Sequence, residues 1–464
     1  MAKLHELTAM ELAELIRNGE VSSREVVSAH LARIEAVNGR VNAVTVVLSE
    51  TALAAADRAD GVRRRGKSLA SLHGVPFTVK ESMDCVGTAT SYGVPALRNA
   101  MPYVDAPVVA RMKAAGAILI GRTNLSELGL RLCTNNPLWG LTRNPWGQKL
   151  TAGGSSGGDA AAVATGMTPI GIGSDMGGSL RVPAHCCGVA ALKPTTGRIA
   201  HAASLPPRDL GMAGQAMLAP GPMARSVADL RLCLSLVSGR NIRDPRSVDA
   251  PLVGPEPEQR QIALVTDVPG ADIPADTLAA VVRAGELLAR EGWTVEEISP
   301  PEVTRVGELW RKLIATDLSA IMPLVEPMVS EELFEHVMQL CRAAKLHEVS
   351  NNRLHEERSR LMREWSGFFS EYPVAIGPNL TAPPWPPNGD LDPKVPELLA
   401  RATRFILPGN ALSLPVAAIP VRLSEGPPTG IQVYADLWRE DLCLEVADII
   451  ERGLGRPSPI DPVP

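Results

Sequence analysis

Two glycine-rich segments of the chain contain serines that are suited to nucleophilic chemistry. One runs Gly153-Gly-Ser155-Ser-Gly-Gly158, and the other, Ser174–Arg181, places Ser179 directly after two glycines. Glycine permits turns in which consecutive N–H groups point the same way, and such donors stabilise the negative charge of an acyl-transfer transition state by roughly 3–4 kcal/mol each. We therefore predict that Ser179 is a nucleophile. Its oxyanion hole would be formed by the N–H groups of Met176, Gly177, Gly178 and Ser179.

A serine hydroxyl becomes a nucleophile only when a base removes its proton. No histidine lies in a recognised catalytic motif, and we expect His185 and His201 to be satisfied or surface histidines. Lys80 instead ends the apolar run 75–79. Burial at the end of such a run disfavours the ammonium form and lowers the pKa of a lysine from about 10.4 toward neutrality. Lys80 is therefore the predicted general base.

The segments around Lys80 indicate the elements that must position it. Residues 75–79 and 117–121 have the composition of short buried strands, and a helical pattern covers 108–115 between them. This alternation predicts strands of an α/β sheet. The two serine segments follow, on either side of an alanine-rich helix predicted over 159–165.

The N-terminal region is predicted to be an all-helical layer, residues 1–65. Thr8 and Ser22 each begin a capping box, the pattern in which a serine or threonine is followed three residues later by glutamate. Gly19 and Gly39 are the predicted ends of these two helices, and a third helix is expected at 50–65.

The rest of the chain alternates between helical and strand patterns. The predicted helices cover 226–237, 275–290, much of 302–370 and 441–452, and the predicted strands cover 261–266, 294–298, 416–421 and 430–434. We find no repeat or flexible linker. We therefore expect a single domain over 1–464, made of the helical layer at 1–65, a catalytic core at 66–240, a helical apron near the substrate pocket at 302–370, and returning core strands and a helix at 400–464.

The composition argues against several classes of protein. The net charge of −5 means that the chain has no overall excess of basic residues, which nucleic-acid binding usually requires. The first residues carry several acids and no apolar signal-peptide core, and no run approaches the roughly 18 apolar residues of a membrane span. The seven cysteines are odd in number and form no C-x-x-C pair, which predicts buried thiols rather than disulfides or a zinc site. We expect a cytoplasmic protein.

Taken together, these motifs resemble the amidase signature family. The matching segments include both serine motifs and several runs around them, at 74–81, 121–127, 140–146, 153–164, 171–183, 187–195, 220–229 and 430–433. The resemblance covers most of the chain and is weakest at about 255–400. It implies an α/β fold with a large mixed central β-sheet flanked by helices on both faces, and an enzyme that hydrolyses C–N acyl bonds.

The resemblance also implies a serine–serine–lysine triad. Ser179 would attack the carbonyl, Ser155 would lie on a cis peptide bond and relay the proton, and Lys80 would accept that proton as a neutral amine. Neither a metal nor an organic cofactor is implied. We expect Asp175 and Arg181, which flank the nucleophile, to form a structural ion pair. Met176 departs from the family pattern, in which smaller or β-branched residues are common, and its side chain could narrow the acyl pocket.

The substrate is less closely defined than the chemistry. Candidate pocket residues are Cys133 and Thr134, within 132–135, together with Trp139, the apron and Trp385. They favour an uncharged apolar or aryl amide, and carbamates or activated esters could share the tetrahedral intermediate. A homodimer is expected by analogy.

Two other functions are compatible with parts of the sequence. The A subunit of a tRNA-dependent glutamyl amidotransferase also resembles this chain, although no glutamine-binding pair can be assigned. A glutaminase assay with tRNA partners separates such an amidotransferase component from a free-standing amidase. A non-catalytic binding module is the third possibility, and the intact Lys80, Ser155 and Ser179 argue against it.

Overall fold

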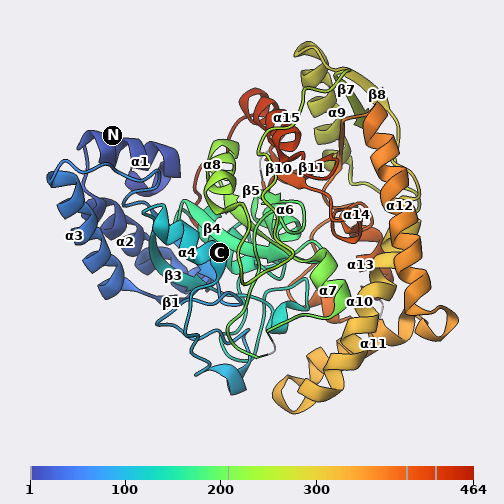
Figure 1. The fold of residues 1–464 in the computed structure, drawn as a ribbon, viewed down its shortest axis with the longest axis horizontal. Coiled ribbons are helices and arrows are strands. Elements are labelled where there is room, and N and C mark those ends of the chain that lie inside the picture. Colours follow the sequence, from blue (N-terminus) through green and yellow to red (C-terminus); the bar gives the residue numbers. More distant parts are fainter. Residues whose placement is uncertain (1–2, 207, 393–394, 424–425, 464) are drawn as a thin grey trace.

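In the computed structural model, which describes residues 3–206, 208–392, 395–423 and 426–463, eleven strands form one mixed β-sheet (Figure 1). In sheet order they are β1 (Val44–Val47), β3 (Ile118–Thr123), β2 (Pro76–Lys80), β4 (Ile170–Asp175), β6 (Ala219–Ala224), β5 (Ala190–Lys193), β10 (Val416–Val421), β11 (Thr429–Ala435), β9 (Val374–Pro378), β7 (Gln261–Leu264) and β8 (Thr294–Glu297). β2 pairs in parallel with β3 and β4, and β7 pairs in parallel with β8 and β9. The other neighbours are antiparallel.

Helices cover both faces of this sheet, as the fold class predicted. One face packs against α1 (Ala9–Asn18), α4 (Pro107–Ala114), α8 (Val227–Val237), α9 (Ala275–Arg290) and α15 (Glu440–Leu454). The other packs against α2 (Ser23–Val41), α3 (Ser49–Arg64), α5 (Gly157–Ala164), α6 (Arg181–Cys187), α10 (Val303–Val325) and α12 (Asn351–Glu371). Alternate strand residues supply the two cores: Ile419 of β10 faces the first, and Ala418 faces the second.

The predicted strands with branched apolar side chains are all present, as β2, β3, β7, β8, β10 and β11. Five strands were not predicted: β1, β4, β5, β6 and β9. β6 contains Pro220 and Pro222, which lack the N–H that a central strand normally donates. β5 pairs with β6 only at Met223 and Ala224, so the prolines lie where β6 has no partner on that side.

The capping predictions hold at the start of the chain. The Thr8 and Ser22 side chains both accept an N–H from the glutamate three residues later, and Gly19 closes α1 in the left-handed conformation. The predicted stop at Gly39 is wrong, because α2 continues to Val41 and Asn42 supplies the left-handed cap. The layer is also not entirely helical, since β1 lies within it as an edge strand.

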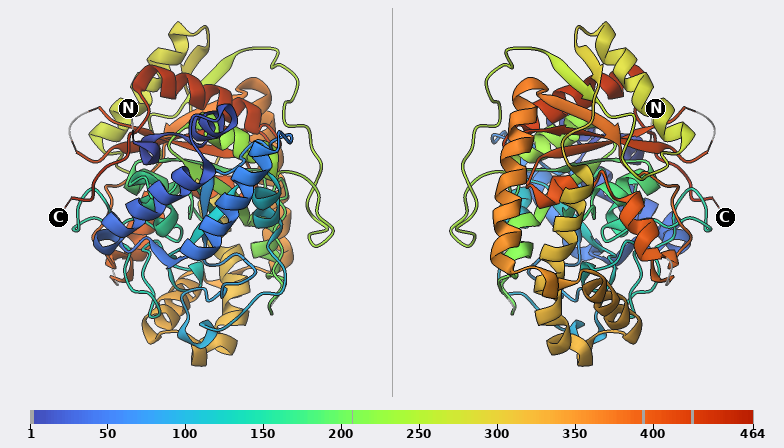
Figure 2. Two further views of the ribbon diagram at one scale, coloured as in Figure 1. Left: turned by 90° about the vertical axis from the view of Figure 1, so that its left-hand side faces the viewer. Right: turned by 90° about the vertical axis from the view of Figure 1, so that its right-hand side faces the viewer.

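The helices α10, α11 (Glu331–Ala343) and α12 occupy the range predicted for the apron. Figures 1 and 2 place them at the end of the sheet opposite the N-terminal helices. Shorter helices complete the structure: α7 (Met212–Met217), α13 (Val395–Ala402) and α14 (Leu407–Ala411). Across the described ranges, no helix combines the length and apolar character that crossing a bilayer requires.

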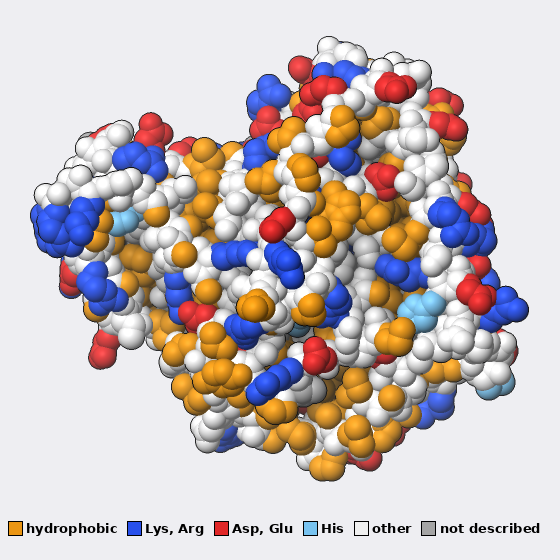
Figure 3. Space-filling model, in the orientation of Figure 1, with side chains coloured by type: hydrophobic (Ala, Val, Ile, Leu, Met, Phe, Trp, Pro, Cys, Tyr) orange, Lys and Arg blue, Asp and Glu red, His pale blue; other side chains and the backbone are white. Residues whose placement is uncertain are grey.

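The face of the molecule in Figure 3 carries basic and acidic side chains interspersed among apolar ones. All seven cysteines are buried free thiols, as predicted.

Candidate active site

Lys80 lies at the end of β2 and is only 1% exposed. Its Nζ atom is 2.6 Å from Ser155 Oγ, 3.0 Å from Ser156 Oγ and 3.2 Å from Ser174 Oγ. The parallel register of β2 with β4 explains the contact with Ser174, because both strands end on the same side of the sheet, and Ser155 and Ser156 reach Lys80 from the loop before α5. The predicted base and the predicted relay serine are therefore in hydrogen-bond contact.

The segment around Ser155 is held by close backbone contacts. The Gly154–Ser155 peptide bond is cis, as the family resemblance implied. A Cβ atom at Gly154 would lie 2.6 Å from the carbonyl oxygen of Arg131, so only glycine fits there. The Thr134 hydroxyl donates to the Gly153 carbonyl at 2.9 Å and accepts the Gly157 N–H at 2.9 Å. Thr134 thus fixes the loop that presents Ser155.

Ser179 stands at the turn between β4 and α6 and is 8% exposed. The Ser156 N–H donates to the Ser179 carbonyl at 3.2 Å, which joins the two serine segments. The Asp175 carboxylate organises the same turn, because it accepts the N–H groups of Gly178 at 2.8 Å and Leu180 at 3.1 Å.

The bond from Gly178 corrects one part of the predicted oxyanion hole. The Gly178 N–H is already engaged by Asp175, so it is not free to stabilise a developing oxyanion. The N–H groups of Met176, Gly177 and Ser179 make no hydrogen bond within the described residues. These three remain as candidate donors.

A buried network holds Asp175 in place. Arg181 Nε lies 3.1 Å from Asp175 Oδ2, and both side chains are fully buried, which confirms the predicted ion pair. Asn410 bridges the pair, accepting from Arg181 at 2.6 Å and donating to Asp175 at 2.9 Å. Burial alone would raise the pKa of Asp175, but the positive charge of Arg181 keeps that pKa well below its usual value. Asp175 therefore stays ionised and keeps the turn that carries Ser179 fixed.

Burial acts on the pKa of Lys80 in the opposite direction to its effect on a carboxyl group, because the charged form of lysine is the protonated one. Loss of water lowers the pKa of Lys80 to about 8, although the charges of Asp159 and Asp175 act to raise it. Burial also raises the pKa of Asp159, whose carboxylate accepts a hydrogen bond from Thr123 at 2.7 Å. A lysine with a pKa this close to neutrality can serve as a proton acceptor at moderately alkaline pH.

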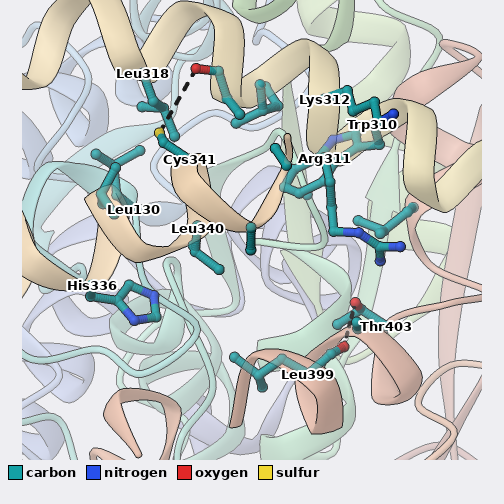
Figure 4. Close-up of a pocket in the computed structure, with 18 of the residues that line it drawn as sticks. Leu130, Trp310, Arg311, Lys312, Leu318, His336, Leu340, Cys341, Leu399 and Thr403 are labelled. Carbon is teal, nitrogen blue, oxygen red and sulfur yellow. Dashed lines mark hydrogen bonds between the residues drawn. The ribbon is translucent and has the colours of Figure 1, made fainter. Parts of the chain in front are cut away.

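Ser179 opens onto a cavity of about 590 Å³ (Figure 4). This volume lies within the range of small-molecule sites. Its wall is largely apolar, and among the residues that form it are Leu130, Leu132, Met176, Trp310, Ile314, Leu318, Val337, Leu340 and Leu407. The apron thus contributes α10 and α11 to the wall, which Met176 and Ser179 also line.

The predicted pocket roles of Cys133 and Thr134 are not supported by this arrangement. Among described residues, the wall includes their neighbour Leu132 but neither of them. The Cys133 thiol is buried and accepts the Asn388 N–H at 3.3 Å, and Thr134 is used by the serine loop. Trp139 and Trp385 also lie outside the wall.

Trp310 is a site residue that the sequence did not indicate. Its indole Nε1 donates to the Met176 carbonyl at 2.8 Å. A Cβ at Gly177 would lie 2.4 Å from the Trp310 ring, so the ring packs directly on the turn that carries Ser179. Trp310 therefore links α10 to the backbone that carries the candidate oxyanion donors.

We expect Trp310→Phe to lower kcat by about tenfold, because small displacements of catalytic groups are costly. Trp365→Phe is the matched control, since it removes an indole bond of equal length, 2.8 Å to the Pro301 carbonyl, away from the cavity. The control should lower the melting temperature but keep kcat. Steady-state kinetics and thermal melts measure both effects. A wild-type kcat in Trp310→Phe would show that this bond does not position the turn.

Neither a metal site nor a phosphate site emerges from the described residues. No group of three or more His, Cys, Asp or Glu side chains among them is arranged to hold a metal ion. The run Gly61-Val-Arg-Arg-Arg-Gly-Lys-Ser68 has the spacing of a phosphate-binding loop. Its first residues belong to α3, however, so it lacks the strand–loop–helix context that such a loop requires.

Comparisons with known proteins agree with this geometry. Residues 25–444 match the amidase family. The chain is 42% identical to an indoleacetamide hydrolase of Bradyrhizobium diazoefficiens, over 97% of this chain and 86% of that protein. It is 30% identical to the A subunit of the glutamyl-tRNA(Gln) amidotransferase of Chloroflexus aggregans, over 97% of both chains.

Solved structures show the same fold. The structure of 6-aminohexanoate cyclic dimer hydrolase with its substrate superimposes with a TM-score of 0.80 at 28% identity, covering 98% of both chains. The greater identity to an indoleacetamide hydrolase than to an amidotransferase subunit favours amide hydrolysis over the amidotransferase alternative. This chain belongs to the amidase family and is a hydrolase of carbon–nitrogen bonds in non-peptide amides.

Proposed function

We propose that this amidase hydrolyses primary amides of arylacetic acids, of which indole-3-acetamide is an example, to the carboxylic acid and ammonia. The observation that carries the proposal is the apolar cavity that opens on Ser179. The apolar surface that a planar ring buries there contributes about 25 cal/mol per Å² to binding. The identity to an indoleacetamide hydrolase over nearly the whole chain supports the same substrate class.

In the proposed mechanism, neutral Lys80 accepts a proton from Ser155 while Ser155 accepts the proton of Ser179. Ser179 Oγ attacks the carbonyl carbon, and the N–H groups of Met176, Gly177 and Ser179 stabilise the oxyanion. The C–N bond then breaks, and the proton returns through Ser155 to the nitrogen, which leaves as ammonia. Water attacks the acyl-enzyme ester with the same base and releases the carboxylic acid.

Carbamates and activated esters pass through the same tetrahedral intermediate, and we include them as secondary substrates. Their hydrolysis would need no further catalytic group, because only the leaving atom differs.

A substrate panel tests this function. The purified chain should hydrolyse indole-3-acetamide and 2-phenylacetamide with a kcat/KM at least about 100-fold above that for acetamide, because the small amide leaves the apolar wall unfilled. Ammonia release and chromatography of the acid measure the products. Preference for acetamide or for glutamine would contradict the proposed substrate class.

The pH dependence of kcat/KM follows from the pKa of Lys80. The neutral amine is the active form, and its fraction rises with pH, so the rate should rise through the pKa of about 8 and then level off. Below that value each pH unit should cost about tenfold in rate. Initial rates from pH 6 to 10, with pH-jump controls for stability, measure the profile. A rate that falls as pH rises through this range would contradict a lysine base.

A further inference from the structure

His336 is a polar side chain on an otherwise apolar part of the cavity wall. It is the first wall residue of α11, ahead of Val337, Leu340 and Cys341, and is only 9% exposed. Figure 4 shows the imidazole beside Leu340 and on the same side of the view as Leu130, whereas Arg311 and Thr403 occupy the other side. The ring therefore lies among apolar side chains of the cavity wall.

Within the described residues, His336 forms no hydrogen bond. Buried polar groups in folded proteins nearly always have a partner, and those that lack one within the protein are candidates for contact with a ligand. The nearest charged groups that influence the ring are Asp390 and Arg131, and these two are already paired with each other at 2.8 Å. The ring nitrogens of His336 are therefore available to form hydrogen bonds with a substrate in the cavity.

The chemistry of the wall indicates what His336 would recognise. Burial lowers the pKa of His336, so the ring is neutral and presents one N–H donor and one nitrogen acceptor. The other nitrogen-bearing side chains of the wall carry donors only: Arg131, Trp310, Arg311, Lys312 and Lys345. The glutamates of the wall are at least partly exposed to solvent. Among the nitrogen-bearing side chains, therefore, only His336 can accept a hydrogen bond from a substrate.

On this basis, and resting on the proposed function, we propose that His336 selects acyl groups whose aromatic ring carries an N–H, by accepting a hydrogen bond from that N–H. The recognised class is a nitrogen heterocycle of the indole type attached to the acyl carbon through a short linker. His336 would thus be a specificity-determining residue that touches the substrate and takes no part in proton transfer.

A matched pair of substrates tests this inference. Indole-3-acetamide and benzothiophene-3-acetamide have similar shapes, but sulfur replaces the N–H in the second. The wild-type enzyme should favour the indole in kcat/KM by about tenfold or more, because the analogue leaves the buried acceptor unpaired. His336→Leu should bring this ratio close to one, whatever the substitution does to the rate on either substrate alone. His336→Asn, which retains an acceptor, should preserve part of the ratio.

The ratio between two substrates is a readout that a general loss of stability does not change. A wild-type ratio near one decides against the role of His336 even if a variant fails to fold, and a ratio that persists in folded His336→Leu does so too. Equal kcat/KM values for the two substrates would overturn the role of His336 and leave the proposed function intact. Failure to hydrolyse either one, alongside hydrolysis of acetamide, would overturn the proposed function and this inference with it.

Discussion

Ser179→Ala is expected to reduce kcat by at least about 10⁴-fold, because the substitution removes the atom that forms the acyl-enzyme. Ser179 is 8% exposed, lines the cavity and is the only serine of the two motifs that does so. The fold should persist, since the backbone bonds of the turn are made by Asp175 rather than by the Ser179 hydroxyl. Hydrolysis of 2-phenylacetamide, followed by ammonia release, measures the loss.

Ser23→Ala is the control for this experiment. Ser23 is fully buried near the start of α2, and its hydroxyl has no hydrogen-bond partner among the described residues. Its removal should leave both kcat and the melting temperature near the wild-type values. If Ser179→Ala retained more than about a hundredth of the activity of Ser23→Ala, another group would have to be the nucleophile.

Lys80→Met is expected to reduce kcat by about 10³-fold, within the range that general-base catalysis contributes. Methionine keeps the volume of the buried side chain but offers no nitrogen to Ser155, which the lysine approaches to 2.6 Å. The residual rate should also lose the titration near pH 8 and the plateau above it. Increasing pH should restore part of the activity, because hydroxide can then assist deprotonation of the serines.

The chain provides a closely matched control in a second buried lysine. Lys193 of β5 is fully buried, and its Nζ donates to the Pro194 carbonyl at 2.8 Å. Burial and the charge of Arg181 lower the pKa of Lys193 to about 7. Lys193→Met should keep the rise of kcat/KM through pH 8 even if it lowers the melting temperature. If Lys193→Met abolished the rise of kcat/KM through pH 8 and Lys80→Met retained it, the assignment of Lys80 as the base would be contradicted.

Local sequence patterns predicted the helices and strands that are specified by their own residues, without contacts from distant parts of the chain. The capping boxes at Thr8 and Ser22 and the branched strands such as β10 required no knowledge of the rest of the fold. β4 and β6 were missed because their glycines and prolines are typical of loops, and they are strands because they pair with each other and with β2 and β5. Their residues are held by tertiary contacts that local propensity does not represent.

The candidate site likewise contains contacts that the sequence predicted and contacts that it did not. The meeting of Lys80 with Ser155 was predicted from the family resemblance, and the two side chains are in contact. The bond from Trp310 to Met176 joins residues 134 positions apart, and no local pattern marks it. Cys133 and Thr134 were predicted to line the pocket as part of the segment 132–135, but only Leu132 of these three lies in the wall, and the other two side chains form buried hydrogen bonds.

The central claim is that Ser179 is the nucleophile of a lysine-assisted acyl transfer. A fluorophosphonate probe tests it most directly, because the probe forms a stable bond with an activated serine. After proteolysis, mass spectrometry should locate a single adduct on Ser179, and Lys80→Met should slow its formation while Ser23→Ala should not. An adduct on any other serine, or an active enzyme that forms none, would contradict the account.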